Sequence, residues 1–140
     1  MDRIAMWLTL GFFLTSCGLG SAQAQGKAAK GLVYYNGFSG TIVSCFNSTL
    51  TAPSNATPPC GFSATRFSTG DYVIDFGFKV DTHAFSVSGA TQFLTLCTDT
   101  NGMPGCAGTT VTANQVELIP QRLTSQGLQL VDTDIYLVVF

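Results

Sequence analysis

The sequence predicts an all-β protein, an antiparallel β-sandwich of about eight strands with a jelly-roll-like arrangement. Alternate positions of residues 70–80 carry rings and branched carbons, with a mostly polar set between them. This is the pattern of a strand with one buried face. Short runs of the same kind recur about every ten residues, separated by segments rich in glycine, proline, serine and asparagine. No segment shows a helical period.

The first half of the chain contains four candidate strands. Their ranges are 32–36, 41–47, 62–67 and 70–80. Residues 37–40 are long enough for a hairpin loop. Residues 48–59 have a loop composition, and Pro58-Pro59 excludes a central strand there. Tyr72, Ile74, Phe76, Phe78 and Val80 form the predicted buried face, and Val73, Asp75, Gly77 and Lys79 form the polar face.

The second half contains four more candidates and one weakly patterned stretch, 123–130. The candidates are 84–88, 91–97, 109–119 and 134–140. Asn101-Gly102 is a preferred centre of a tight turn, and Pro120 is expected to end or bulge the strand before it. The last run, 134–140, is apolar on both faces, so both faces must be covered by other residues or by another subunit. We therefore expect Tyr136, Val138 and Phe140 to contact another subunit.

Residues 1–24 are interpreted as a signal peptide, because a short apolar core precedes the cleavage pattern Ala22-Gln23-Ala24. Residues 25–31 are expected to form a leader, and residues 32–140 a single domain. Alternatively, Leu14-Thr15-Ser16-Cys17 is a lipobox, and a lipoprotein signal ends before an acylated Cys17. Both alternatives place the protein outside the cell or in the cell envelope, and the second adds a lipid anchor.

Charged residues make up 10% of the chain, against about 25% in ordinary soluble domains. The chain has no basic stripe that could neutralise phosphates, so we expect no nucleic-acid partner. No run after the signal is long enough to cross a bilayer as a helix. Little charge together with 46% hydrophobic residues indicates that another subunit covers part of the surface.

Four cysteines remain after signal removal, an even number that suggests disulfides in an exported protein. Sequence alone permits three pairings of Cys45, Cys60, Cys97 and Cys106. Cys45–Cys60 and Cys97–Cys106 are favoured, because each pair brackets one turn-rich loop. Zinc is not expected, since no CxxC spacing is present.

The residues that could carry chemistry are few, and we expect no enzyme, cofactor or metal. His83 follows Asp81 on a predicted turn, but no nucleophile motif accompanies it. Asp99, Asp132 and Asp134 are a conceivable calcium set, although the later ligands of a calcium loop are missing. A small secreted hydrolase that uses His83 and aspartates is the alternative function.

Aromatic residues gather near the first predicted hairpin, at Tyr34, Tyr35, Phe38 and Phe46. Such residues stack on sugars or anchor a protein partner, but more often they fill a core. Tyr34, Tyr35 and Phe38 are our candidate binding surface for a protein or a carbohydrate.

The strand around Tyr72 resembles one in the heads of complement and tumour-necrosis-factor type jelly rolls, including bacterial and phage-fibre versions. Phe67, Gly70, Tyr72, Ile74 and Phe76 carry the resemblance, together with an apolar C-terminal strand. It implies a homotrimer with ligands on its outer surface. The chain is also similar to chaperone–usher pilins, which are exported, β-rich, low in charge and disulfide-bonded, but residues 25–31 lack an apolar donor pattern. We expect an exported, non-catalytic binding or assembly module, with a pilin-like subunit as an alternative.

Overall fold

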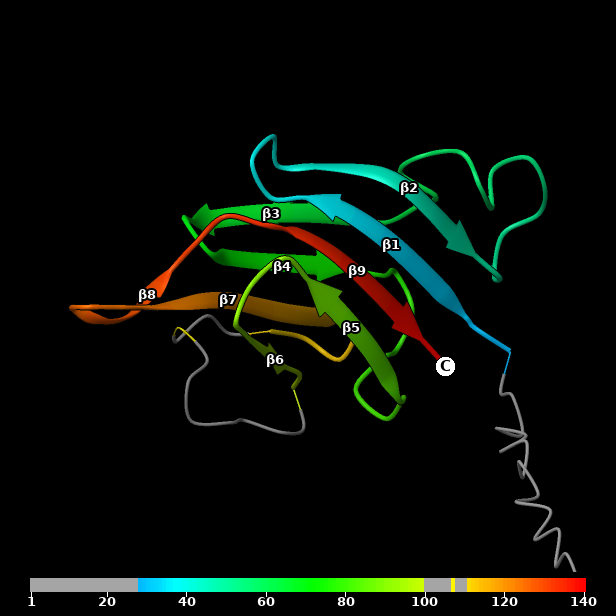
Figure 1. Ribbon diagram of the computed structural model, residues 1–140. Coiled ribbons are helices and arrows are strands. Elements are labelled where there is room, and N and C mark those ends of the chain that lie inside the picture. The colour runs from blue at the N-terminus through cyan, green and yellow to red at the C-terminus, as the bar shows by residue number, and fades with distance from the viewer. Residues whose placement is uncertain (1–27, 100–106, 108–110) are drawn as a thin grey trace, which may run out of the picture.

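The computed structural model describes residues 28–99, 107 and 111–140. In these residues nine strands form two antiparallel sheets that face each other, without any helix (Figure 1). The predicted antiparallel β-sandwich is therefore confirmed. The predicted signal peptide, Cys17, Cys106 and the Asn101-Gly102 turn lie outside the described residues.

Sheet A has the strand order β2-β1-β9-β5, and sheet B has the order β3-β4-β7-β6, with β8 paired to the far part of β7. The strands of sheet A are β1 (Gly31–Asn36), β2 (Thr41–Asn47), β5 (Phe85–Gly89) and β9 (Asp134–Val139). The strands of sheet B are β3 (Ser63–Ser68), β4 (Asp71–Asp75), β6 (Phe93–Cys97), β7 (Gln115–Thr124) and β8 (Gly127–Leu130). The first and last described strands, β1 and β9, pair directly along their whole length.

The hydrophobic core lies between the two sheets, where alternate residues of facing strands meet. Sheet B contributes Tyr72, Ile74 and Leu118, and sheet A contributes Tyr35 and Leu137. All five are almost completely buried. Burying a side chain of this size contributes about 1.5–3 kcal/mol, so the alternation of polar and apolar residues decides which face of each strand turns inward.

The strand predicted at residues 70–80 is shorter than predicted and more buried. β4 ends at Asp75, because Gly77 adopts a positive φ of 66° and turns the chain. Phe76 and Val80 still reach the core from the turn that follows. Val73 was predicted on a polar face, but it is buried, with 6% of its surface exposed.

Pro120 neither ends nor visibly interrupts its strand, contrary to the prediction. β7 continues through it from Gln115 to Thr124. On one side of β7 the pairing with β4 stops at Leu118, and the pairing with β8 starts at Gln121. Pro120 lies between these two pairings. Proline has no backbone N–H, but at this position neither partner strand requires one for the ladder. Its carbonyl accepts a hydrogen bond from the Val131 amide.

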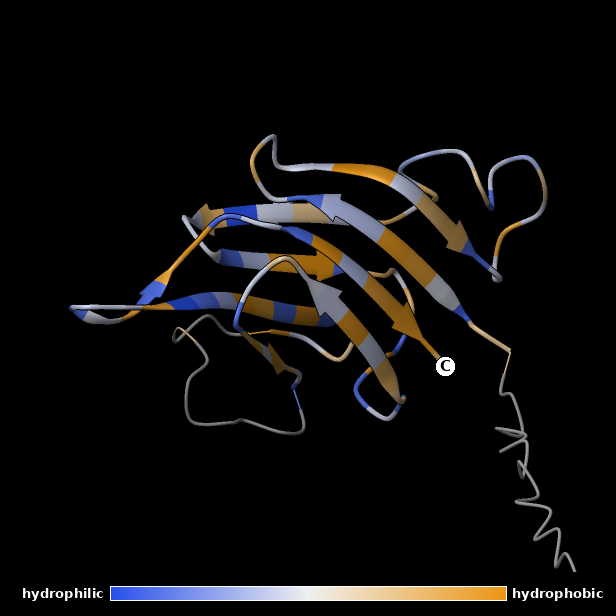
Figure 2. Ribbon diagram, in the orientation of Figure 1, coloured by the Kyte–Doolittle hydropathy of each residue, from blue (hydrophilic) through white to orange (hydrophobic). Residues whose placement is uncertain are grey.

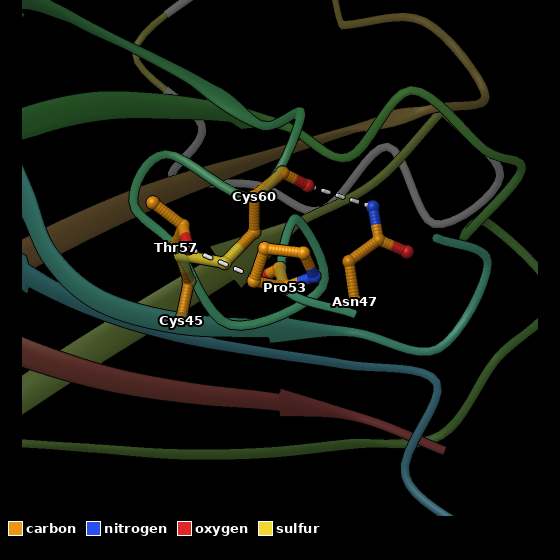
Figure 3. The surroundings of a disulfide bond; sticks show 5 residues. All are labelled: Cys45, Asn47, Pro53, Thr57 and Cys60. Carbon is orange, nitrogen blue, oxygen red and sulfur yellow. Dashed lines mark hydrogen bonds between the residues drawn. A yellow bond between two sulfur atoms is a disulfide. The ribbon is translucent and has the colours of Figure 1, made fainter. Parts of the chain in front are cut away.

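The loop between β2 and β3 is closed by the Cys45–Cys60 disulfide, as predicted (Figure 3). Beside it, the buried Asn47 amide donates to the Cys60 carbonyl oxygen at 2.9 Å. Within the loop, the Thr57 hydroxyl donates to the Pro53 carbonyl oxygen at 2.9 Å. Cys97 is disulfide-bonded too, but Cys106, its predicted partner, is not among the described residues.

Asp132 joins the connection between β8 and β9 to the β3–β4 hairpin. Its carboxylate accepts hydrogen bonds from the Tyr72 hydroxyl at 2.5 Å and from the Gly70 amide at 3.1 Å, and it forms an ion pair with Arg66. Burial opposes the charged form of this carboxyl, but the bonds from Tyr72 and Arg66 outweigh it and lower the pKa of Asp132. This network holds the start of β9 in place.

Candidate functional site on the outer face of sheet A

The outer face of sheet A is the surface where the predicted ligand-binding and subunit-contact residues meet. Burial alternates along β1 and β9, so every second residue points away from the core, although Figure 2 shows hydrophobic residues on both faces of these strands. Strand register then places these residues in rows across the sheet. The outward positions are Leu32, Tyr34, Asn36, Thr41, Ser44, Phe46, Ser86, Ser88, Asp134, Tyr136 and Val138. We call this set the sheet A face.

Tyr34 of β1 and Tyr136 of β9 form the centre of the sheet A face. They are directly opposite each other in the register, and their rings stack with centroids 4.4 Å apart and planes 4° from parallel. Tyr136 remains 52% exposed. Ser44 and Ser88 extend this row on the two outer strands. The row is thus an aromatic pair between two small hydroxyl residues.

The stacking geometry determines how these rings can be used. Two rings lying flat on a sheet could not have centroids only 4.4 Å apart, because they would overlap sideways. The rings of Tyr34 and Tyr136 therefore stand up from the sheet, each covering one face of the other. A sugar-stacking platform requires an open ring face, whereas upright rings present edges and hydroxyls to a partner surface.

Asp134 keeps Tyr34 in position. The Tyr34 hydroxyl donates to Asp134 Oδ2 at 3.0 Å. The hydrogen bond to this carboxylate, with smaller effects of burial and of the negative charge of Asp134, raises the pKa of Tyr34 to about 12. Tyr34 is therefore a neutral hydrogen-bond donor at any physiological pH. Asp134 is the only charged side chain among the described residues of the sheet A face.

An apolar row runs beside the tyrosine pair. Register aligns Phe46, Leu32 and Val138 on three adjacent strands, and Ser86 completes the row on β5. Phe46 is exposed, and Leu32 and Val138 are partly exposed. Apolar side chains in adjacent rows of a sheet form a continuous patch of the kind that proteins cover with a partner.

The structure separates the three residues of the predicted binding surface. Tyr34 lies on the sheet A face, but Tyr35 is 1% exposed and packs edge-on against Tyr72 in the core. The prediction for Tyr35 is therefore wrong, because adjacent strand residues point to opposite faces. Phe38 is in the turn between β1 and β2, 71% exposed and apart from the sheet. Tyr136 and Val138 join Tyr34, and Phe140 follows β9, partly exposed.

Two of the aspartates considered for catalysis or calcium binding are held by other groups. Asp132 is bound to Tyr72 and Arg66, and Asp134 is bound to Tyr34. Within the described part of the chain, no group of three or more His, Cys, Asp and Glu side chains could hold a metal ion. His83 lines a surface pocket of about 360 Å³ with Ala28, Lys30, Thr82 and Phe140, where no side chain resembles an activated nucleophile.

Sequence reasoning missed Leu32 and Asp134 as members of the site. A signal was present for Leu32, since residues 32, 34 and 36 of one predicted strand must share a face. The alignment of these residues with β9 depends on pairing between residues about 100 positions apart in the sequence, which periodicity does not reveal.

No protein-family model, curated protein or solved structure matches the chain. In the described residues no helix is long and apolar enough to cross a membrane.

Proposed function

We propose that this protein is an exported, non-catalytic assembly module that associates with copies of itself through the sheet A face. The observation that carries the proposal is the exposed patch that crosses sheet A from Phe46 through Leu32 to Val138, beside the upright Tyr34–Tyr136 pair. It lies on the opposite side of the sheet from the core and carries one charge, on Asp134. Association therefore requires little desolvation of charge. The Cys45–Cys60 disulfide supports an oxidising compartment outside the cytoplasm.

The upright rings favour a protein partner over a carbohydrate, because stacking covers one face of each ring and turns the ring edges and hydroxyls toward a partner. A homo-oligomer supplies such a partner without any further component. The resemblance to complement-head jelly rolls implies that its copy number is three.

Sedimentation of the exported, processed protein tests the proposal. We expect an oligomer at micromolar concentration, and we expect Tyr136→Arg to shift it to monomer, because the variant places a charge in the centre of the contact. Thr65→Arg on the exposed strand β3 is the matched control and should leave the mass unchanged. A folded wild-type monomer at this concentration would contradict self-association.

A further inference from the structure

Tyr34 and Tyr136 differ from the other two tyrosines of the chain in how far they are open to solvent. The chain contains four tyrosines. Tyr136 is 52% exposed and Tyr34 is partly exposed, whereas Tyr35 is 1% and Tyr72 is 0% exposed. A reagent in solution oxidises an exposed phenol faster than a buried one. The pair on the sheet A face is therefore where an external oxidant meets the tyrosines of this protein.

The two exposed rings are held in a geometry suited to the formation of a bond between them. Their centroids are 4.4 Å apart and their planes are 4° from parallel, so carbon atoms of one ring lie over the other ring. Next to Asp134, the hydroxyl of Tyr136 also raises the pKa of Tyr34, so the two hydroxyl ends lie beside each other. The ring carbons adjacent to each hydroxyl carry much of the unpaired electron of a phenoxyl radical. Reactive atoms held together in this way reach effective molarities of about 10⁵ M or more.

Asp134 is placed to take the proton that an oxidised phenol releases. The Tyr34 hydroxyl donates to Asp134 Oδ2 at 3.0 Å, within the range in which a general base accepts a proton. A phenol that loses an electron becomes a strong acid, so the proton moves along this hydrogen bond as the electron leaves. Oxidation of Tyr34 then leaves a neutral radical instead of a positive charge on a partly buried ring. Tyr35 has no such base, since its buried hydroxyl bonds no described residue.

We propose that Tyr34 and Tyr136 form a site of oxidative modification, at which a one-electron oxidant joins the two rings into an intrachain dityrosine. Each phenol gives up one electron and one proton, and the two radicals form a bond between the carbons next to their hydroxyls. The hydrogens on these carbons then move to the oxygens, which restores both phenols. A peroxidase passes the two electrons and two protons to one hydrogen peroxide, which leaves as two waters. The protein thereby loses two hydrogen atoms in total.

The new bond links β1 to β9, the first and last described strands, which pair along their whole length in the middle of sheet A. A covalent link between residues far apart in sequence restricts the unfolded chain, as a disulfide does. Oxidation thus stabilises the sandwich at a place that the Cys45–Cys60 disulfide does not reach. This inference goes beyond the proposed function and does not depend on self-association.

Treatment of the exported, processed protein with peroxidase and hydrogen peroxide tests the proposal. We choose a concentration well below micromolar, at which the sheet A face is free. The expected product has the mass of one chain less two hydrogen atoms, shows dityrosine fluorescence, and yields a peptide that links Tyr34 to Tyr136. Tyr34→Phe and Tyr136→Phe should each abolish this link. Tyr35→Phe, which removes a buried hydroxyl without a described partner, is the matched control and should crosslink as the wild type does.

The role of Asp134 has its own test. Asp134→Asn should slow the crosslinking at least about tenfold, because an amide does not accept the phenol proton. Near-ultraviolet circular dichroism checks that the rings of this variant remain stacked. A slower reaction of the wild type in deuterium oxide measures the same proton transfer without a substitution. An unchanged rate in both measurements overturns the assignment of Asp134 as proton acceptor.

The outcomes separate this inference from the proposed function. The inference is overturned by a folded wild type that forms no dityrosine, by a link through Tyr35 or Tyr72, or by a product that is only a covalent dimer through Tyr136. An intrachain link that forms more slowly as the concentration rises to micromolar supports both claims, because another copy then covers the pair. An intrachain link that forms at the same rate at every concentration supports the inference and contradicts the proposed self-association.

Discussion

Tyr34 and Tyr35 are adjacent in the sequence but point to opposite faces of sheet A. Tyr34 stands on the surface of sheet A against Tyr136, whereas Tyr35 is enclosed in the core against Tyr72. Burial raises the pKa of Tyr35, and burial together with the hydrogen bond to Asp132 raises the pKa of Tyr72. Tyr34 gains its raised pKa mainly from the hydrogen bond to Asp134. The alternation of side chains along β1 thus decides which of the two adjacent tyrosines belongs to the site.

The ionisation of Tyr34 provides a test at this scale. We expect its phenol to ionise near pH 12 in the folded protein, rather than near its ordinary value of 10. Because the folded-state pKa is the higher one, the stabilisation by this bond is fully present below pH 10 and is lost as the pH rises through 12. Ultraviolet absorbance of phenolate measures this, with Tyr34→Phe to assign the transition.

Asp134→Asn should move the Tyr34 transition back toward its ordinary pKa, since the carboxylate that favours the neutral phenol is gone. If Tyr34 ionises at the same pH in the folded and unfolded chains, its hydrogen bond to Asp134 does not exist in solution.

Among the elements, the loop between β2 and β3 depends most on a covalent bond. These strands are the outer strands of the two sheets on one side of the sandwich, and no backbone ladder joins them. The Cys45–Cys60 bond closes the segment between them, across 15 residues of sequence. β2 also carries Phe46 of the sheet A face, so the disulfide helps to hold one end of the apolar row.

Removing the Cys45–Cys60 disulfide tests how much it stabilises the β2–β3 loop. We expect Cys45→Ser/Cys60→Ser to lower the free energy of unfolding by about 3 kcal/mol, the chain-entropy estimate for a loop of this length. Denaturant unfolding of the oxidised protein measures the change. Thr57→Val removes only a hydrogen bond inside the loop and should cost about 1 kcal/mol or less. A loss below about 1 kcal/mol for the double variant would mean that the Asn47 hydrogen bonds already fix the loop.

At the scale of the whole molecule, the sandwich has two outer surfaces of unusual apolarity. One is the sheet A face, and the other consists of Phe93, Leu123, Leu128 and Leu130 on sheet B. The whole chain carries a net charge of −2, and only 10% of its residues are charged. Electrostatic repulsion between copies is therefore weak, and contact between apolar surfaces governs their association.

The salt dependence of self-association tests whether apolar contact or charge governs it. We expect self-association to change less than about twofold when the salt concentration rises from roughly 0.05 to 0.5 M, because screening acts on exposed charges and the contact faces carry almost none. Sedimentation equilibrium at several salt concentrations measures the effect. A marked weakening at high salt would show that charges such as Arg122 and Asp134 provide most of the attraction, contrary to the apolar contact proposed here.

Several features were predictable from local pattern because they depend on residues close in sequence. The apolar runs 32–36 and 134–140 predicted strands that the structure contains as β1 and β9. The loop composition of 48–59 between two cysteines predicted the Cys45–Cys60 bond. Pro120 shows the limit of such rules. A proline is incompatible with an unbroken ladder, but here the ladder changes partner at that residue.

Side-chain alternation and turn chemistry are local properties, so they were sufficient to predict the all-β class, the approximate strand positions and the disulfide that closes the β2–β3 loop. The contact between Tyr34 and Tyr136, the burial of Val73 and the shared exposed face of the leucines of β7 and β8 became visible only in the folded protein. Each of these depends on which strands become neighbours. That choice is made by the packing of two sheets around one core, between residues far apart in the chain.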